Sequence, residues 1–514
     1  MKRWLDRIGQ ERLTEAALFV LLVACYTYTF PRWADPNQNS RLDMVVAVVE
    51  DGTFQIDPYV ENTVDYAKVG EHYYSDKAPG TAFLGIPLYA GLKVFLDLPV
   101  VDRLTGRLAN SEAFKSTLRT EGSGVLRQKV RFALAQVVLT FVISVLPSSF
   151  IGVLIYRLLA CFTPNVWIRL VVVLGYGLLT PAFAYANAFY GHQLSAALLF
   201  GAFYLVFAGR KPLSRAVLLG VGTLLGYSVI TEFPSVLIAG VLFLYTLFEL
   251  YREGSWPRIG WVMPTGALIA AGWMWYNTAV FGGPLKLGYS NSELWINQHH
   301  AGFMSLTLPH WDAAWGITFG IFRGLFVLSP WLLLAFPGFW LWRRSRERGP
   351  EFWVAVTSLF SFFLFNSSSG MWWGGFAIGP RYLLPMLPFM ALSIIFVFRE
   401  WGGRLWLRVL TAVLMLWSLA ATWGLTLAEQ AFPSDAIRNP FVAYAWPNWL
   451  AGNIARNVGT LLGLRGVLSL LPLGIVLVVI SAGWWMLNRV GAGGYSPKAV
   501  GVPGGTQQPS GSHG

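Results

Sequence analysis

Runs of about 20 apolar residues, the length that a helix needs to cross a bilayer, recur along nearly the whole of this 514-residue chain. Hydrophobic residues make up 55% of the chain and charged residues only 12%, a balance that excludes an ordinary soluble domain. The sequence therefore predicts an all-α polytopic membrane protein with about 12 transmembrane helices. The expected spans are 15–31, 131–156, 167–187, 193–209, 214–230, 234–250, 257–276, 327–342, 352–366, 383–398, 404–424 and 466–487.

The positions of Lys and Arg predict the orientation of these spans. Basic residues precede the first span and then fall in every second loop, which is typical of the cytoplasmic side. Both termini are therefore expected in the cytoplasm, and the segments 32–130, 277–326 and 425–465 outside. The basic positions are Lys2, Arg3, Arg7, Arg12, Arg157, Arg169, Arg210, Lys211, Arg215, Arg252, Arg258, Arg343, Arg344, Arg346, Arg348, Arg399, Arg404, Arg408 and Arg489.

Two parts of the chain do not follow the simple pattern of spans and short loops. Residues 80–97 are apolar, but if they crossed the membrane every later basic loop would be exported. They are expected to form an interfacial helix within the large first external loop. The tail 490–514 is rich in Gly, Pro, Ser and Gln and is expected to be a disordered cytoplasmic extension of a domain spanning 1–489.

The net charge of +12 follows from the positive-inside bias together with basic residues at the outer rim. It does not indicate a nucleic-acid partner. Cys25 and Cys161 have no metal-ligand spacing and are expected to be packing residues.

Polar chemistry is concentrated in the tract His72-Tyr73-Tyr74-Ser75-Asp76-Lys77-Ala78-Pro79-Gly80, which is expected to be a loop before the interfacial helix. Lys77 lies just before Pro79, which favours the first turn of a helix. A Lys at this depth can bind a lipid phosphate, or it can anchor the helix by snorkelling. Both interpretations stay open at this point.

The tract from His72 to Gly80, taken with Asn39-Ser40-Arg41, resembles the first external loop of the C-type (GT-C) glycosyltransferases that use polyprenyl-phosphate sugars. This superfamily includes the protein O-mannosyltransferases and the lipid A aminoarabinose transferases. In that family an aromatic-rich tract ending in Lys-Pro-Pro opens a surface helix, and its Lys contacts the carrier phosphate; Lys77 matches that Lys. Asn187–His192 lies where relatives carry an acidic residue, and Phe281–Tyr289, Arg323–Pro330 and Gly379–Pro385 resemble tracts of a bacterial subgroup of glycosyltransferases.

The resemblance implies an integral membrane glycosyltransferase that moves a sugar from a polyprenyl-phosphate carrier to an acceptor on the outer face. The acceptor is a lipid, a glycan or a protein, and membrane lipids surround the enzyme. Some members bind a divalent ion through acidic residues, so a divalent metal ion stays open as a cofactor.

The catalytic base is where this chain departs from the family pattern. An acceptor hydroxyl that attacks the sugar must lose its proton, and a carboxylate can take it. Family members place an acidic pair before the Arg that Arg41 resembles, whereas this chain has Gln38 and Asn39 there. Asp43 and Asp65 are the preferred candidates for the base. The other candidates are Asp57 and Asp76, with Asp35 just upstream.

Further site candidates lie at the expected outer ends of spans. Arg381 follows Gly379-Pro380 and can bind the donor phosphate bidentately. Glu232 is an ionisable group at membrane depth, and His192 can position the acceptor or share the role of the base. The remaining candidates are Arg41, Tyr74, Arg323 and Tyr382. The histidines His299, His300 and His310 lack the carboxylate spacing of a closed metal site.

Two other classes of protein are alternatives. A transporter or flippase of lipid-linked sugars should carry charge inside the bundle at both leaflets, whereas here the ionisable residues gather at one face. A lipid-linked oligosaccharide polymerase or ligase should carry paired arginines in a large late external loop, where this chain has only Arg438 and Arg456.

Overall fold

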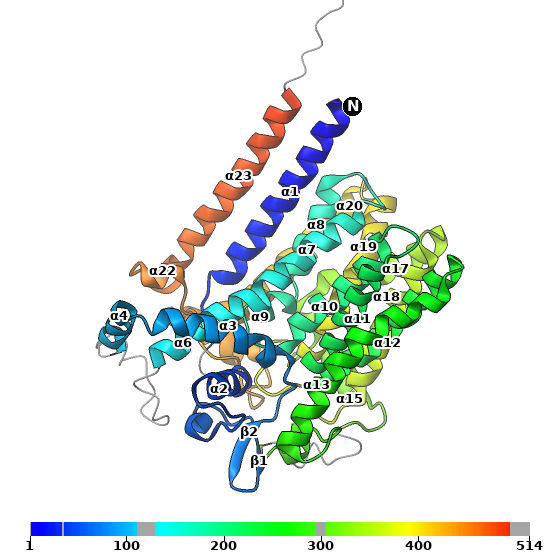
Figure 1. Cartoon of the computed structure of the whole chain (residues 1–514). Helices are drawn as coiled ribbons and strands as arrows, with labels where there is room; N and C mark the ends of the chain where they lie inside the picture. Colours follow the sequence, from blue (N-terminus) through cyan, green and yellow to red (C-terminus); the bar gives the residue numbers. More distant parts are fainter. Residues whose placement is uncertain (1, 33–34, 110–128, 295–304, 494–514) are drawn as a thin grey trace, which may run out of the picture.

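The computed structural model describes residues 2–32, 35–109, 129–294 and 305–493, and shows a helical bundle with a small hairpin at one end (Figure 1). Helices α1 and α23 lie side by side along one flank, where Trp484 donates a hydrogen bond to Thr14 (3.0 Å). The α-helices of the first half are α1 (Lys2–Thr27), α2 (Pro36–Glu50), α3 (Gly80–Leu96), α4 (Pro99–Ala109), α6 (Lys129–Thr140), α7 (Leu146–Leu159), α8 (Val166–Leu178), α9 (Pro181–Ala186), α10 (Gly191–Ala208), α11 (Arg215–Thr231), α12 (Val236–Arg252) and α13 (Met263–Phe281). Those of the second half are α15 (Trp311–Thr318), α16 (Leu325–Leu328), α17 (Ala335–Ser345), α18 (Gly349–Ser367), α19 (Leu387–Trp401), α20 (Leu405–Leu427), α21 (Trp446–Leu450), α22 (Val458–Leu461) and α23 (Leu471–Gly493).

Short 3-10 and π-helical turns join these helices. Several of them extend an α-helix, as η3 does between α6 and α7 and η8 does before α19. They are η1 (Asp57–Asn62), η3 (Phe141–Val145), η4 (Phe233–Ser235), η5 (Trp256–Val262), η6 (Gly288–Asn291), η7 (Pro330–Leu334), η8 (Arg381–Met386), η9 (Phe441–Ala445) and η10 (Gly466–Leu470).

All twelve segments that the apolar runs predict as spans are largely helical, which confirms the predominantly helical fold. Among the described residues, six helices are long and apolar enough to cross a membrane, or seven if the bent pair α3–α4 is one span. They identify the chain as an integral membrane protein, while the count of about 12 crossings stays a prediction. The six are Lys129–Leu159, Gly191–Ala208, Phe233–Arg252, Arg381–Trp401, Leu405–Leu427 and Gly466–Asn488.

The first polar segment differs from the expected loop because it contains two strands. β1 (Tyr66–Val69) and β2 (His72–Ser75) pair antiparallel, with Tyr66 opposite Ser75 and Val69 opposite His72. Gly70 adopts a φ of 62° in the two-residue turn between them, a conformation that glycine takes without a steric cost. The tract that begins at His72 is therefore a strand followed by a turn, and the fold is helical apart from this hairpin.

The expected interfacial helix at 80–97 is observed as α3, which runs from Gly80 to Leu96 and bends by 93° into α4. Helix α4 exposes Val100, Leu104 and Leu108 to the surroundings. Its position on the membrane surface stays a prediction. Residues 110–128 of the expected external segment 32–130, and residues 494–514, which make up most of the expected disordered tail, lie outside the described residues.

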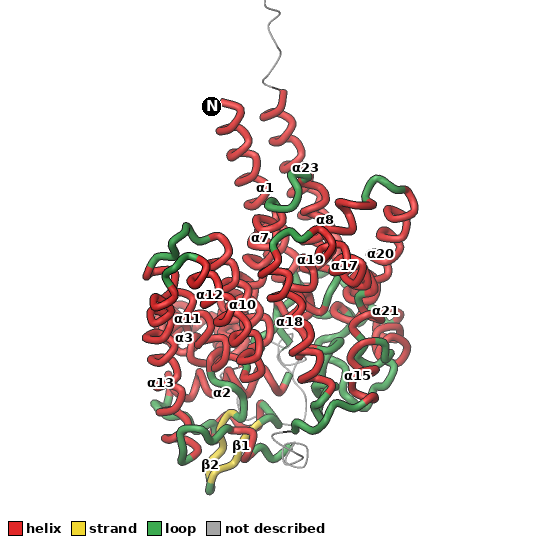
Figure 2. The backbone as a smooth tube through the Cα atoms, turned by 90° about the vertical axis from the view of Figure 1, so that its right-hand side faces the viewer, coloured by secondary structure: helices red, strands yellow, loops and turns green. Residues whose placement is uncertain are grey.

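The alternate basic connections gather at one end of the bundle. The ring of Trp342, at the end of α17, packs against Phe162 from the α7–α8 connection and Phe396 from α19, with centroids 5.8 and 5.1 Å apart. Both described ends of the chain lie at this same end (Figure 2). The ion pairs here are Arg157–Glu15 at 2.6 Å, Arg169–Glu11 at 2.7 Å, Lys211–Glu253 at 3.1 Å and Arg399–Glu347 at 2.8 Å. The hairpin lies at the opposite end, and the side of the membrane that each end faces stays a prediction.

Candidate functional site

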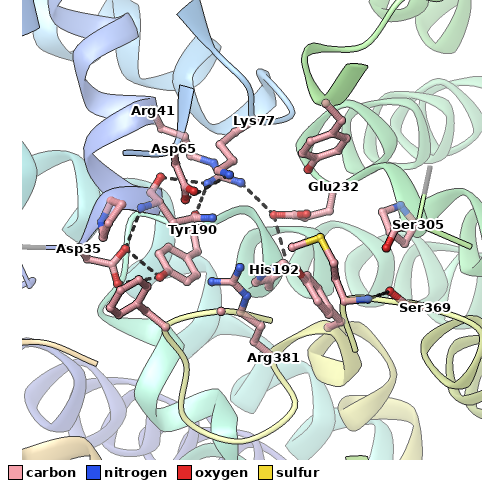
Figure 3. A pocket seen from close by; sticks show the side chains of 18 of the residues that line it. Asp35, Arg41, Asp65, Lys77, Tyr190, His192, Glu232, Ser305, Ser369 and Arg381 are labelled. Carbon is pink, nitrogen blue, oxygen red and sulfur yellow. Dashed lines mark hydrogen bonds and ion pairs between the residues drawn. The ribbon is translucent and has the colours of Figure 1, made fainter. Parts of the chain in front are cut away.

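A cavity lined by charged, aromatic and apolar side chains lies beside the hairpin, where Asp65 and Lys77 flank β1 and β2. Figure 3 shows it from close by. The space between its walls is about 970 Å³, a figure that includes its opening to solvent. Segments far apart in the sequence form its walls: the start of α2, the hairpin, the start of α10, the α11–α12 turn and the residues around α18 and η8. The lining residues are Asp35, Pro36, Asn37, Arg41, Asp65, Lys77, Tyr190, His192, Glu232, Pro234, Tyr289, Ser305, Phe365, Ser369, Met371, Gly375, Phe376, Arg381 and Tyr382.

Asp35 reaches the cavity because it is the N-cap of α2. Its carboxylate accepts hydrogen bonds from the backbone N–H groups of Asn37 (3.0 Å) and Gln38 (3.3 Å), and Pro36 supplies the fixed φ of the first turn. The Tyr190 hydroxyl lies 2.8 and 2.7 Å from its two carboxylate oxygens. Burial raises the pKa of Asp35, although the Tyr190 hydrogen bond and the guanidinium of Arg381 oppose this shift.

Lys77 lies between two carboxylates just after β2. Its ammonium is 3.1 Å from Asp65 and 3.0 Å from Asp76, and its side chain is 8% exposed. The second oxygen of Asp76 accepts a hydrogen bond from Ser292 (2.9 Å), so Asp76 is fixed beside Lys77 without lining the cavity. Burial by itself lowers the pKa of Lys77, but the two carboxylates outweigh it and the pKa is raised. Lys77 therefore stays positively charged.

Arg41 and His192 share the carboxylate of Glu232. One oxygen of Glu232 lies 3.1 Å from the Arg41 guanidinium and 3.3 Å from Nδ1 of His192. Glycines allow the close approach of the elements that carry these groups. A Cβ on Gly191 would lie 2.5 Å from the Glu232 carboxylate, and one on Gly80 would lie 2.6 Å from the Thr231 hydroxyl.

Arg381 differs from the other two cations because it has no carboxylate partner within ion-pair distance among the described residues. Its side chain is 9% exposed, and its Nε has no hydrogen-bond partner there. The guanidinium instead lies over the rings of Tyr190 and Tyr382, at 5.2 Å from each centroid. A buried cation that lacks a protein anion is suited to bind an anionic ligand.

Besides Asp35, seven of the residues predicted from sequence therefore meet in one cavity. They come from the α2, hairpin, α10, α11–α12 and η8 regions, and chain folding alone brings them together. They are Arg41, Asp65, Lys77, His192, Glu232, Arg381 and Tyr382.

Besides Asp76, two more of the predicted carboxylates lie outside the lining. Asp43, a preferred candidate for the base, is fully buried within α2 and accepts a hydrogen bond from Asn62 (3.2 Å). Burial raises the pKa of Asp43 well above its ordinary value, and the Asn62 bond only partly opposes this. Asp57 holds the hairpin instead, through His72 (2.7 Å) and the backbone N–H of Tyr73 (2.7 Å).

Tyr74 and Arg323 also lie outside the lining. The Tyr74 ring packs edge-on against Phe281, with centroids 6.3 Å apart. Arg323 donates to the carbonyls of Trp373 (3.1 Å) and Gly375 (2.9 Å), so it shapes the loop that forms one wall of the cavity.

Gln38 and Asn39 stand where the family pattern has an acidic pair. Their side chains form hydrogen bonds with backbone groups and do not line the cavity. Gln38 accepts from the Phe189 N–H (2.8 Å), and Asn39 donates to the Asn62 carbonyl (2.8 Å). Asp35, three residues before Gln38, faces the cavity in their place. An Asp-Pro pair ahead of an apolar segment is a helix N-cap signal, so the sequence does contain the information that places Asp35.

The sequence-based prediction missed Tyr190, Tyr289, Ser305 and Ser369 as lining residues. Tyr190 lies two residues before His192, so its proximity to the site could have been inferred. No local signal marks the two serines, because only the packing of residues near 305 against residues 366–371 brings them to the cavity.

No metal ligands are assigned in the described part of the chain, where no group of three or more His, Cys, Asp and Glu residues could hold an ion. His310 caps α15 by accepting from the Ala313 N–H (3.4 Å), and His299 and His300 lie outside the described residues.

No protein-family model matches the sequence, and neither does any curated protein. Among solved structures, the chain is similar to ArnT from Cupriavidus metallidurans in the apo state and to the same protein bound to undecaprenyl phosphate. In both cases the identity is 15%, the TM-score is 0.46, and the match covers 95% of this chain and 75% of the other.

Proposed function

We propose that the chain is an integral membrane glycosyltransferase that moves a sugar from a polyprenyl-phosphate carrier to an acceptor hydroxyl at the outer face of the membrane. The observation that carries the proposal is the buried guanidinium of Arg381, which lacks a carboxylate partner among the described residues and lines the same cavity as Lys77. The match of Lys77 to the phosphate-contacting Lys of the family motif supports the same interpretation.

The proposed role of Arg381 and Lys77 is to bind the phosphate of the donor. When the bond between the sugar and the phosphate breaks, negative charge grows on the departing phosphate. Cations that are already in place stabilise that charge without reorganising during the reaction. Arg41 lies in the same cavity, held at 3.1 Å by Glu232, and adds to the positive potential.

The proposed base is Asp35. Of the lining carboxylates, Asp65 is paired with Lys77 and Glu232 with Arg41, whereas Asp35 accepts from a neutral hydroxyl and from backbone N–H groups. Burial raises the pKa of Asp35, which makes its carboxylate a stronger base. Asp65 then has the role of holding Lys77, and Asp43, buried against Asn62, has no contact with the reaction.

The outer face is proposed because the cavity lies at the end of the bundle opposite the basic connections. These connections are expected on the cytoplasmic side by the positive-inside rule. Donor and acceptor would therefore meet outside.

The test is transfer by the purified protein in lipid vesicles, with a radiolabelled undecaprenyl-phosphate-linked hexose as donor and an extract of envelope lipids and glycans as acceptor. The expected result is labelled product together with free undecaprenyl phosphate, both formed about 100-fold or more slowly with Asp35→Asn. Movement of the intact lipid-linked sugar across the bilayer without release of the carrier would identify a flippase and refute the proposal.

A further inference from the structure

Ser305, which lines the cavity, has two energetically unfavourable features, a strained backbone and a buried hydroxyl without a partner among the described residues. Its φ is 74°, in the left-handed region that non-glycine residues rarely adopt. The residue is 5% exposed, and its hydroxyl has no hydrogen-bond partner in the described part of the chain. A strained residue with an unpartnered buried hydroxyl in a cavity is a candidate ligand contact.

Ser305 shares its side of the cavity with a second neutral residue, Ser369. The backbone N–H of Gly370 donates to the Ser305 carbonyl (2.7 Å), and a β-bridge joins Leu306 to Ser369, so the two serines are held together. Figure 3 shows both of them on the side of the cavity away from Asp35. The backbone N–H of Met371 donates to the Ser369 hydroxyl (3.1 Å), and Tyr289, Phe365 and Phe376 add aromatic rings to the lining of the same cavity.

We propose that this side of the cavity is the subsite for the sugar of the donor, and that the sugar is uncharged, with the Ser305 hydroxyl hydrogen-bonded to one of its hydroxyl groups. This inference rests on the proposed function, which places the donor phosphate at Arg381 and Lys77. Sugar hydroxyls need neutral donors and acceptors, which the serines supply, and the C–H faces of a sugar ring pack on apolar and aromatic side chains. An amino sugar or a uronic acid would bring a charge to Ser305 and Ser369, which supply no counter-ion among the described residues.

The decisive variant is Ser305→Gly, because it removes the hydroxyl and relieves the backbone strain at the same time. Glycine adopts a positive φ without a steric cost, so the melting temperature should equal or exceed that of the wild type. Affinity for an undecaprenyl-phosphate-linked neutral hexose should fall about three- to tenfold, the range for loss of one neutral hydrogen bond. Affinity for undecaprenyl phosphate alone should not change.

Ser305→Ala and Glu429→Gly are the matched controls. Ser305→Ala removes the same hydroxyl but keeps the strain, so it should show the same loss of affinity without added stability. Glu429 also has a positive φ, 53°, but does not line the cavity, so Glu429→Gly should leave both affinities unchanged.

Binding of the donors to the wild type in nanodiscs gives a second test. The neutral hexose donor should bind at least about tenfold more tightly than the same donor with an amino sugar. Equal binding of the two donors, or unchanged affinity of Ser305→Gly for the hexose donor, would overturn the subsite while leaving the proposed function intact. Parallel losses for the hexose donor and the bare carrier would also overturn it, and failure of the wild type to bind either ligand would refute the proposed function itself.

Discussion

Replacing Arg381 with Gln should weaken donor binding while leaving the fold intact, which is unusual for a buried arginine. Most buried arginines are paired, and their removal leaves a carboxylate without a cation at a cost of about 3–5 kcal/mol. Arg381 has no such partner among the described residues and contacts the rings of Tyr190 and Tyr382. Losing two cation–π contacts at a buried site costs about 2 kcal/mol for each, and relief of the buried charge, whose burial costs several kcal/mol, offsets much of this.

Arg381→Gln should reduce the free energy of donor binding more than it reduces the stability of the fold. A charge-assisted hydrogen bond to phosphate contributes about 1.5–3 kcal/mol. Since about 1.4 kcal/mol corresponds to a factor of ten, the KM for a polyprenyl-phosphate sugar should rise about tenfold to more than a hundredfold in Arg381→Gln. The melting temperature should stay within a few degrees of the wild type.

The assay measures the donor KM in vesicles and the melting temperature in detergent for Arg381→Gln and for a matched buried arginine, Arg169→Gln. Arg169 is 1% exposed and pairs with Glu11 (2.7 Å) at the opposite end of the bundle. It should show the reverse pattern, with a lower melting temperature and an unchanged KM. An unchanged donor KM in Arg381→Gln, or a loss of stability as large as that of Arg169→Gln, would refute the assignment of Arg381 as the phosphate ligand.

The same geometry leads to three further predictions. Lys77→Ala should lower the rate of transfer from the donor about tenfold to a hundredfold, and Lys77→Arg should recover only part of that rate, since a planar guanidinium does not reproduce a point charge between two carboxylates. Full activity of Lys77→Arg with a small loss in Lys77→Ala would instead identify Lys77 as a snorkelling anchor. Asp35→Asn should lower the rate of transfer about 100-fold or more at unchanged donor KM, whereas Asp43→Asn should transfer at nearly the wild-type rate; a larger loss in Asp43→Asn would reverse the assignment of the base. Transfer by the wild type should stop as the pH falls through the raised pKa of Asp35, because a protonated carboxyl cannot accept the proton of the acceptor. For topology, an impermeant thiol reagent on intact cells should label a Cys at position 111, which lies outside the described residues, and should not label one at 214; the opposite pattern would place the cavity on the cytoplasmic side.

The sequence by itself determined the helical architecture and much of the site. Twenty-residue apolar runs can only be buried in lipid or in a helical core, so the segments expected as spans are helical. Cations and carboxylates at the ends of such runs are rare and expensive, which is why the sequence alone singles out Lys77, Glu232 and Arg381. The hairpin was missed because its strands are four residues long and lie in a tract without a clear alternation of apolar and polar residues.

Only the tertiary structure decided which of these charges are partnered. Arg41 and Arg381 look alike in the sequence, but the approach of α11 to α10 at Gly191 brings Glu232 to Arg41 and leaves Arg381 facing aromatic rings. The same holds for Asp35 and Asp43, which belong to the same helix and its cap: the start of α2 meets the cavity and its middle is buried against Asn62. Pairing and burial depend on contacts between segments that are distant in the sequence, and such contacts leave no trace in local composition or spacing.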